Sequence, residues 1–182
     1  MIQLNKNFVD IFENTQIKPQ LVHNITNYVT VNDCANILLA MGSSPIMADD
    51  IEEVEEITTI CSALVLNIGT LNSRTVESMI AAGKKANELG HPVILDPVGA
   101  GASKFRTETT YQLLKEVKFA VIRGNISEIK TVYAGAGTTK GVDADVNDEV
   151  TDETLDTTVT LAKELAKRAG AVIAVTGAMD LI

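Results

Sequence analysis

The sequence predicts an α/β fold in which short buried strands alternate with longer helices around a mostly parallel sheet. Four runs of β-branched or aliphatic residues, each too short for an ordinary helix, occupy residues 63–68, 93–95, 119–122 and 171–175. Helical stretches separate these runs. Nearly continuous apolar strands joined through helices are typical of a parallel sheet covered on both faces, with right-handed crossovers.

The predicted helices cover residues 31–41, 52–60, 73–89, 107–117 and 152–169. For the helix at 73–89, Ser73 is expected to cap the first turn, Gly90 to end the helix, and Pro92 to prevent its continuation. The segment 143–156, rich in carboxylates, is expected to form a solvated loop. No repeat or linker indicates a second domain, so residues 1–182 are expected to form a single domain.

Composition excludes several classes of protein. The chain has 182 residues, 46% of them hydrophobic, which is enough for a sizeable core, and its formal net charge of −9 with no basic stripe excludes nucleic acid as a partner. No segment has the pattern of a signal peptide or the roughly 20 apolar residues of a membrane-spanning helix, so we expect a cytoplasmic protein without a membrane partner. Cys34 and Cys61 have no zinc-site or disulfide spacing.

Each predicted strand ends in a short segment that contains polar residues or glycine, at residues 67–70, 96–99, 123–125 and 176–177. Ligands of open parallel sheets bind outside the carboxyl ends of the strands, so the recurrence favours a binding site over a set of ordinary turns. Residues 99–104 lack the third glycine of a dinucleotide fingerprint, and the sequence contains no GxxxxGK[ST] motif. A Rossmann or P-loop site is therefore not indicated.

Two carboxylates stand out near these strand ends, Asp96 and Glu128. Asn125 and Glu128 have the spacing of a capping box, in which each side chain bonds a free backbone N–H group of the other residue. Alternatively, Asp96 and Glu128 face one cleft and organise the waters of a Mg²⁺ ion around ATP phosphates, and Arg123 grips a phosphate. Both interpretations remain open from the residues alone.

Three further residues near the N-terminus allow structural and functional roles. Asn27 either hydrogen-bonds a substrate or caps the helix at residue 31. His23 is expected to be a structural histidine with satisfied ring nitrogens, because no carboxylate stands at a suggestive spacing. Met47 is ordinarily explained by core packing.

Several segments, in order along the chain, together closely resemble the hydroxyethylthiazole kinase family. They are LVHNITN at 21–27, GSSPIMA at 42–48, LNIGT at 66–70, ILDPVGAGA at 94–102 and IRGN with Glu128 at 122–128, followed by KGVD at 140–143 and VTG at 175–177. These segments extend over almost the whole chain.

The resemblance implies a ribokinase-like three-layer fold with a mostly parallel central sheet, Mg²⁺ as cofactor and ATP as co-substrate. It implies transfer of the γ-phosphate to the hydroxyl of 4-methyl-5-(2-hydroxyethyl)thiazole in thiamine biosynthesis or salvage. It also implies a homotrimer with substrate sites near the subunit boundaries. By resemblance, the substrate-binding residues are Met47 and Asn27, the ATP-binding residues Arg123 and Thr176, and the metal-site residues Asp96 and Glu128.

Members of this family also have a glycine-rich loop with an activating cysteine, which this sequence does not contain. The backbone N–H groups of such a loop form an anion hole, and phosphoryl transfer depends on charge stabilisation of that kind. We therefore assign no catalytic residue and expect the domain to be incomplete at its C-terminus, with activity in the parent protein and not in residues 1–182 alone.

Two alternatives to a thiazole kinase remain open. One is a ribokinase-like kinase for another small alcohol, of the pyrimidine or pyridoxal type, although the Met47 segment and the segment from His23 to Asn27 favour thiazole. The other is a truncated, non-catalytic module that binds thiazole or mediates oligomerisation.

Overall fold

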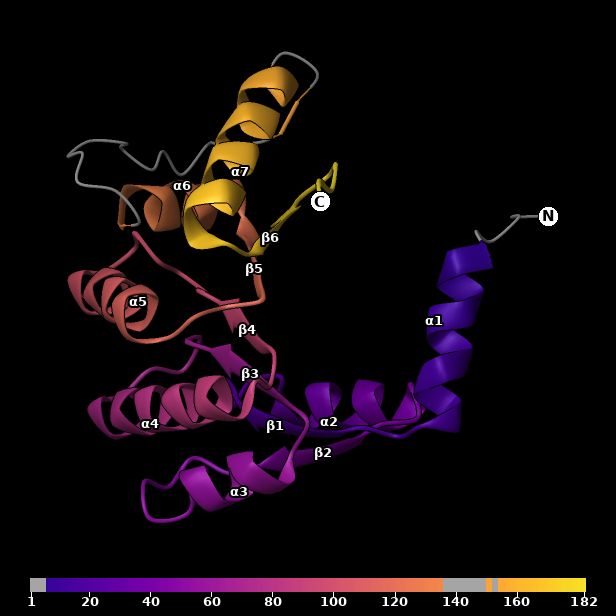
Figure 1. Cartoon of the computed structure of the whole chain (residues 1–182). Helices are drawn as coiled ribbons and strands as arrows, with labels where there is room; N and C mark the ends of the chain where they lie inside the picture. Colours follow the sequence, from indigo (N-terminus) through magenta and orange to yellow (C-terminus); the bar gives the residue numbers. More distant parts are fainter. Residues whose placement is uncertain (1–5, 136–149, 152–153) are drawn as a thin grey trace.

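The computed structural model describes residues 6–135, 150–151 and 154–182, and its six strands form one sheet in the order β2-β1-β3-β4-β5-β6 (Figure 1). All five neighbouring pairs of strands are parallel, as the sequence predicts. The strands are β1 (Leu21–Ile25), β2 (Ser44–Met47), β3 (Ala63–Asn67), β4 (Val93–Asp96), β5 (Val121–Asn125) and β6 (Val172–Thr176). The helices are α1 (Lys6–Ile17), α2 (Val31–Ala40), α3 (Val54–Ile60), α4 (Ser73–Leu89), α5 (Lys104–Glu116), α6 (Ile126–Gly135) and α7 (Leu155–Ala169).

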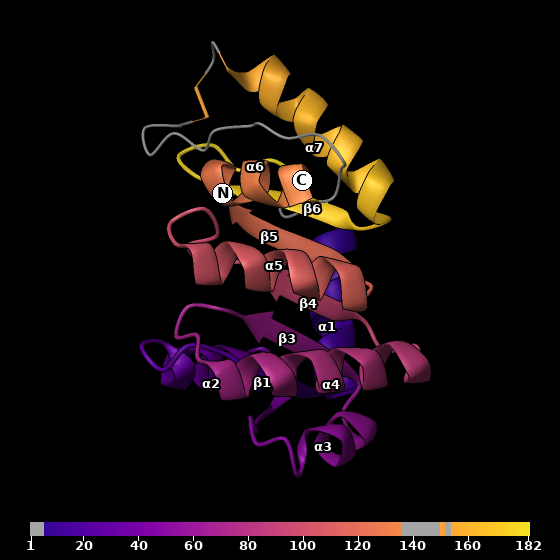
Figure 2. The ribbon, with the colours of Figure 1, turned by 90° about the vertical axis from the view of Figure 1, so that its left-hand side faces the viewer.

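The direction of the chain across the sheet reverses after β2, because β1 is followed by β2 at the sheet edge and the chain then returns past β1 to β3. Right-handed crossovers in opposite directions place their helices on opposite faces. Accordingly, α2 lies on one side of the sheet and α3 to α6 lie on the other (Figure 1). Figure 2 shows α4, α5 and α6 side by side over the sheet, and α7 contacts α6 and β6.

Helices therefore lie on both faces, as expected, but cover them unequally in the part of the chain that the structure describes. The strands β3 to β6 bury one face under α4, α5 and α6. On the other face, Val172 of β6 is 50% exposed and Arg123 of β5 is also exposed.

The core lies between the sheet and the α4–α6 layer. Leu64, Leu66, Leu95 and Ile122 of the strands are fully buried, and Leu113 and Ile129 complete the cluster from α5 and α6. Burial of each such side chain stabilises the fold by roughly 1.5–3 kcal/mol relative to exposure. This core fixes the positions of the strand ends.

Most of the predicted elements agree with the structure. The helix predicted at 73–89 has those bounds, and the predicted strands at 63–68, 93–95 and 171–175 correspond to β3, β4 and β6. The strand predicted at 119–122 is β5, which begins two residues later and continues to Asn125. Its second half was missed because exposed Arg123 and Asn125 alternate with buried Ile122 and Gly124, so the segment is not a continuous apolar run. The segments α1, β1 and β2 were not among the predicted elements.

The predicted N-cap of α4 is wrong. Asn72 is the cap, since its side-chain oxygen accepts from the backbone N–H of Thr75 at 3.1 Å, and its own N–H donates to Thr75 Oγ1 at 3.3 Å. Ser73 is the first helical residue. Gly90 ends the helix as predicted, with a left-handed φ of 71°.

Three predictions fall wholly or partly outside the described residues: the solvated loop at 143–156, the family segment at 140–143 and the start of the helix predicted at 152–169, whose described part is α7. Within the described part of the chain, no helix has the length and apolar character needed to cross a lipid bilayer.

Candidate active site at the carboxyl edge of the sheet

The residues predicted to form the site come from several different strands and reach the same edge of the sheet. Carboxyl ends of parallel strands meet at one edge, and β2, β4 and β6 each end on a predicted residue. Met47 ends β2, Asn27 follows β1, Asp96 ends β4, Arg123 lies in β5, Glu128 lies in the first turn of α6, and Thr176 ends β6.

The β1–β2 side of this edge holds the two predicted substrate-binding residues. Met47 is 37% exposed, so its explanation as a core residue is wrong, and part of its side chain faces solvent. Asn27 Oδ1 accepts from the backbone N–H groups of Val29 and Thr30, at 3.0 Å each, so it orders the turn before α2. The prediction that Asn27 caps this helix is wrong, because Thr30 holds the N-cap position. Asn27 Nδ2 donates to Asn67 Oδ1 at 3.2 Å.

His23 is fully buried, and both of its ring nitrogens have partners, as expected. Nδ1 lies 2.9 Å from Thr58 Oγ1 and Nε2 lies 2.8 Å from the carbonyl oxygen of Ala48. Burial lowers the pKa of His23 below its usual value, because a charged imidazolium loses its hydration there. His23 thus ties the residue that follows Met47 to α3.

Asp96 and Arg123 form an ion pair between β4 and β5. Asp96 Oδ2 accepts from Arg123 Nη1 at 3.1 Å and from Asn67 Nδ2 at 2.8 Å. Burial raises the pKa of Asp96, and the opposing effects of Arg123 and Asn67 are smaller. The Arg123 side chain is 53% exposed, so its guanidinium can also meet an anion from solvent.

Glu128 and Asn125 form the predicted capping box. Glu128 N–H donates to Asn125 Oδ1 at 2.9 Å, and Asn125 N–H donates to Glu128 Oε2 at 2.8 Å. The second carboxylate oxygen, Oε1, accepts from Gly99 N–H at 2.8 Å and so joins the turn after β4 to the start of α6. A hollow of about 220 Å³ opens between these two segments, lined by Gly99, Ala100, Gly101, Ala102, Asn125, Ser127 and Glu128.

Arg106 also organises this edge, although no pattern in the sequence marked it. Its guanidinium donates to the carbonyl oxygens of Ile68 at 3.0 Å, Gly69 at 2.6 Å and Val98 at 2.5 Å. One cation therefore fastens the turn after β3 to the turn after β4. An arginine in the first turn of a helix has no distinctive spacing, so only the structure identifies its partners.

Two carboxylates of this edge, Asp96 and Glu128, are candidates for holding a magnesium ion together with a substrate phosphate. Across residues 6–135, 150–151 and 154–182, no group of three or more His, Cys, Asp or Glu side chains could hold a metal ion by itself. Mg²⁺, however, usually keeps several waters and uses one or two carboxylates together with substrate phosphates. Asp96 and Glu128 supply that number of carboxylates, and each already accepts hydrogen bonds that fix its orientation.

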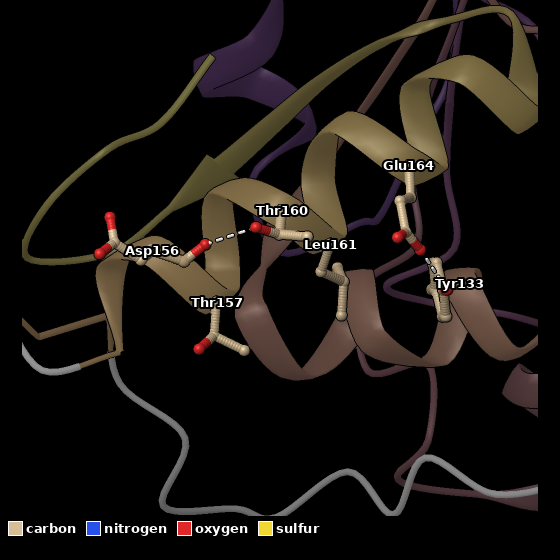
Figure 3. Close-up of a pocket in the computed structure, with 6 residues that line it drawn as sticks. All are labelled: Tyr133, Asp156, Thr157, Thr160, Leu161 and Glu164. Carbon is tan, nitrogen blue, oxygen red and sulfur yellow. Dashed lines mark hydrogen bonds between the residues drawn. The ribbon is translucent and has the colours of Figure 1, made fainter.

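A second hollow lies on the outer surface between α6 and α7 (Figure 3). Its polar groups bond one another: Thr160 Oγ1 donates to the Asp156 carbonyl oxygen at 2.8 Å, and Tyr133 Oη donates to Glu164 Oε2 at 2.6 Å. None of the predicted site residues lines it. The lining residues are Tyr133, Asp156, Thr157, Thr160, Leu161 and Glu164.

Comparison with known proteins gives a consistent picture. A family model described as the hydroxyethylthiazole kinase family matches residues 12–182. Among curated proteins, the hydroxyethylthiazole kinase of Clostridium acetobutylicum is 68% identical over 93% of this chain, and that of Clostridium beijerinckii is 65% identical over 91%. A solved structure of the hydroxyethylthiazole kinase protein from Pyrococcus horikoshii OT3 covers 97% of the chain with a TM-score of 0.83 and 38% identity.

The chain spans about three fifths of the length of these relatives. The matched region is 62% of the Clostridium acetobutylicum protein, 59% of the Clostridium beijerinckii protein and 63% of the Pyrococcus horikoshii chain.

Proposed function

The chain belongs to the hydroxyethylthiazole kinase family, and we propose that the whole protein transfers the γ-phosphate of ATP to the hydroxyl of 4-methyl-5-(2-hydroxyethyl)thiazole. The observation that carries this proposal is the meeting of amide, carboxylate and guanidinium groups at one sheet edge, in a chain that matches the family over residues 12–182. The product would serve thiamine biosynthesis or salvage.

In this proposal, one end of the site binds the thiazole alcohol and the other end binds ATP. Met47 and Asn27, at β2 and β1, contact the thiazole alcohol, and the exposed part of Met47 supplies a polarizable surface for the ring. Arg123 and Thr176, at β5 and β6, contact ATP. The strands β5 and β6 are neighbours, and Thr176 lies in register with Asn125, two residues beyond Arg123. The guanidinium of Arg123 suits a phosphate oxygen.

Asp96 and Glu128 are proposed to hold Mg²⁺, directly or through its waters. When bound with ATP, this ion would neutralise phosphate charge and orient the transferring group. The protein groups themselves fix the geometry: Arg123 holds Asp96 from one side, and Gly99 N–H holds Glu128 against the turn after β4. Positioning of this kind is the main contribution a protein makes to phosphoryl transfer.

We also propose a homotrimer, supported by the exposed apolar side chains around α1 and α2. Ile17 is 80% exposed, Val29 87%, Ile37 60% and Leu39 58%, and α2 contains no buried residue. Large exposed apolar side chains on one region of the chain are often covered by a partner subunit. Size-exclusion chromatography with light scattering should give three times the subunit mass.

The remaining parts of the proposal concern the domain organisation of the chain and its location in the cell. Residues 1–182 belong to one ribokinase-like α/β domain, since the six strands share one sheet. A cytoplasmic location is proposed because ATP is supplied there.

A substrate panel tests the function. We expect Mg²⁺-dependent ADP release by the whole protein with the thiazole alcohol, and much weaker release with hydroxymethylpyrimidine or pyridoxal. Preferential turnover of either of these two alcohols would contradict the proposed substrate. The intact mass of the same sample should be recorded, because it establishes which length of chain carries the activity.

A further inference from the structure

Four side chains form a continuous hydrogen-bonded row along the carboxyl edge of the sheet. Asn27 Nδ2 donates to Asn67 Oδ1 at 3.2 Å, Asn67 Nδ2 donates to Asp96 Oδ2 at 2.8 Å, and Arg123 Nη1 donates to the same Asp96 oxygen at 3.1 Å. The row connects the turn after β1 with β3, β4 and β5, which are consecutive in the sheet. Asn67 is its central member and the only one without an assigned role.

The orientation of the Asn67 amide is fixed by the backbone. Gly69 N–H donates to Asn67 Oδ1 at 2.8 Å, so the oxygen must face this N–H and the amide nitrogen must face Asp96. Asn67 is only 9% exposed. A Cβ on Gly69 would lie 2.8 Å from Asn27 Cβ and 2.9 Å from Asn67 Oδ1, so the absence of a side chain at Gly69 allows the two amides to meet.

The row also crosses the topological switch point of the sheet. The chain leaves β1 toward β2 and leaves β3 toward β4, so the loops after β1 and β3 diverge to opposite sides. Ligand crevices of open α/β sheets form at such a divergence. The bond between Asn27 and Asn67 joins the loops after β1 and β3 at this divergence.

We propose that Asn67 is a positioning residue that holds Asn27, on the alcohol side, and Asp96, on the phosphate side, in one fixed relation. This inference rests on the proposed function. Transfer between two bound reactants is sensitive to displacements of about 1 Å in their relative position, so a rigid link between the two half-sites contributes directly to the rate. Asn67 itself need not touch either reactant.

The isosteric change Asn67→Asp separates the two links. An aspartate keeps an oxygen that accepts from Asn27 and from Gly69 N–H, but it replaces the donor to Asp96 with a second acceptor. In the whole protein, we expect kcat to fall roughly ten- to a hundredfold, the range associated with loss of a hydrogen bond to a charged group. The KM for the thiazole alcohol should change less than about twofold, because the bond to Asn27 remains.

Asn67→Leu, which breaks both links, should lower kcat and also raise the KM for the alcohol. Asn87→Asp is the matched control. Asn87 also uses its side-chain amide as both donor and acceptor, away from the carboxyl edge: it donates to the Lys118 carbonyl oxygen at 2.9 Å and accepts from Lys118 N–H at 2.7 Å. Asn87→Asp should lower thermal stability and leave kcat and both KM values unchanged.

The outcomes separate the positioning role from the proposed function. A wild-type protein that does not phosphorylate the thiazole contradicts the proposed function. Wild-type turnover that Asn67→Asp leaves unchanged contradicts the positioning role alone, as does an equal loss of kcat in Asn87→Asp. A fall in kcat for Asn67→Asp with an unchanged KM for the alcohol supports it.

Discussion

Removing the guanidinium of Arg106 should destabilise the fold more than removing an exposed cation from the same helix. Arg106→Met keeps the length of the side chain but leaves the carbonyl oxygens of Ile68, Gly69 and Val98 without this donor. Hydrogen bonds from a charged donor contribute about 1.5–3 kcal/mol each when well buried, and Arg106 is partly exposed, so we take about 1 kcal/mol for each bond. The expected total is about 3 kcal/mol.

Urea unfolding followed by circular dichroism measures this loss. With a slope of about 2 kcal/mol per molar urea, the midpoint should fall by roughly 1.5 M. Arg106→Lys retains the charge without the planar fork and should lose about half as much. Lys104→Met is the surface control on the same helix, because the Lys104 side chain is 86% exposed and its pair with Glu108 is long, at 3.7 Å. A midpoint for Arg106→Met that equals that of Lys104→Met would refute the role assigned to the three carbonyl bonds.

Three further predictions concern a buried base, a helix cap and a carboxylate. Burial holds the pKa of His23 below its unfolded value of 6.5, so the contribution of the neutral ring to stability is complete above pH 6.5. As the pH falls from 6.5 toward the folded pKa, the free energy of unfolding should decrease by up to about 1.4 kcal/mol per pH unit. Asn72→Ala should cost about 1 kcal/mol of unfolding free energy, whereas Ser73→Ala should change it little. Glu128→Gln leaves one oxygen for two backbone N–H groups, so it should cost about 1–3 kcal/mol and also reduce Mg²⁺-dependent turnover.

Each of these predictions has its own measurement. For His23, the unfolding free energy of wild type minus that of His23→Gln is followed from pH 7.5 to 5.5, and a difference that does not shrink would contradict the prediction. For the cap, equal midpoints of Asn72→Ala and Ser73→Ala in thermal unfolding would contradict the stabilisation assigned to the Asn72 cap. For Glu128, unaltered stability in Glu128→Gln would contradict the cost assigned to losing one of its two backbone bonds.

The elements that sequence reasoning located best are those with an unambiguous apolar pattern. The α4 helix has a capped start, a long amphipathic body and a glycine at its end, and its predicted bounds agree with the structure. The strand β1 was missed because two of its buried residues, His23 and Asn24, are polar. The ring nitrogens of His23 bond partners distant in sequence, and the amide of Asn24 bonds the carbonyl oxygen of Val22. Tertiary contacts decide such a segment.

The position of the site was predictable from the sequence, but the hydrogen bonds between its residues were not. Polar residues at successive strand ends indicated the edge, and the spacing of Asn125 and Glu128 indicated the capping box that the structure contains. The bonds of Asn67 and Arg106 depend on which strands are neighbours. The reversal of chain direction after β2, which makes β1 and β3 neighbours, cannot be inferred from local sequence.

Phosphorus NMR of the reaction product tests the central claim most directly. The whole protein is incubated with Mg²⁺, ATP and 4-methyl-5-(2-hydroxyethyl)thiazole, and the spectrum is compared with that of a sample containing excess EDTA. The proposed function predicts a phosphate monoester signal coupled to the side-chain methylene protons of the thiazole, formed in equal amount with ADP and absent with EDTA. ATP consumed only to inorganic phosphate, with the alcohol unchanged, would contradict the claim.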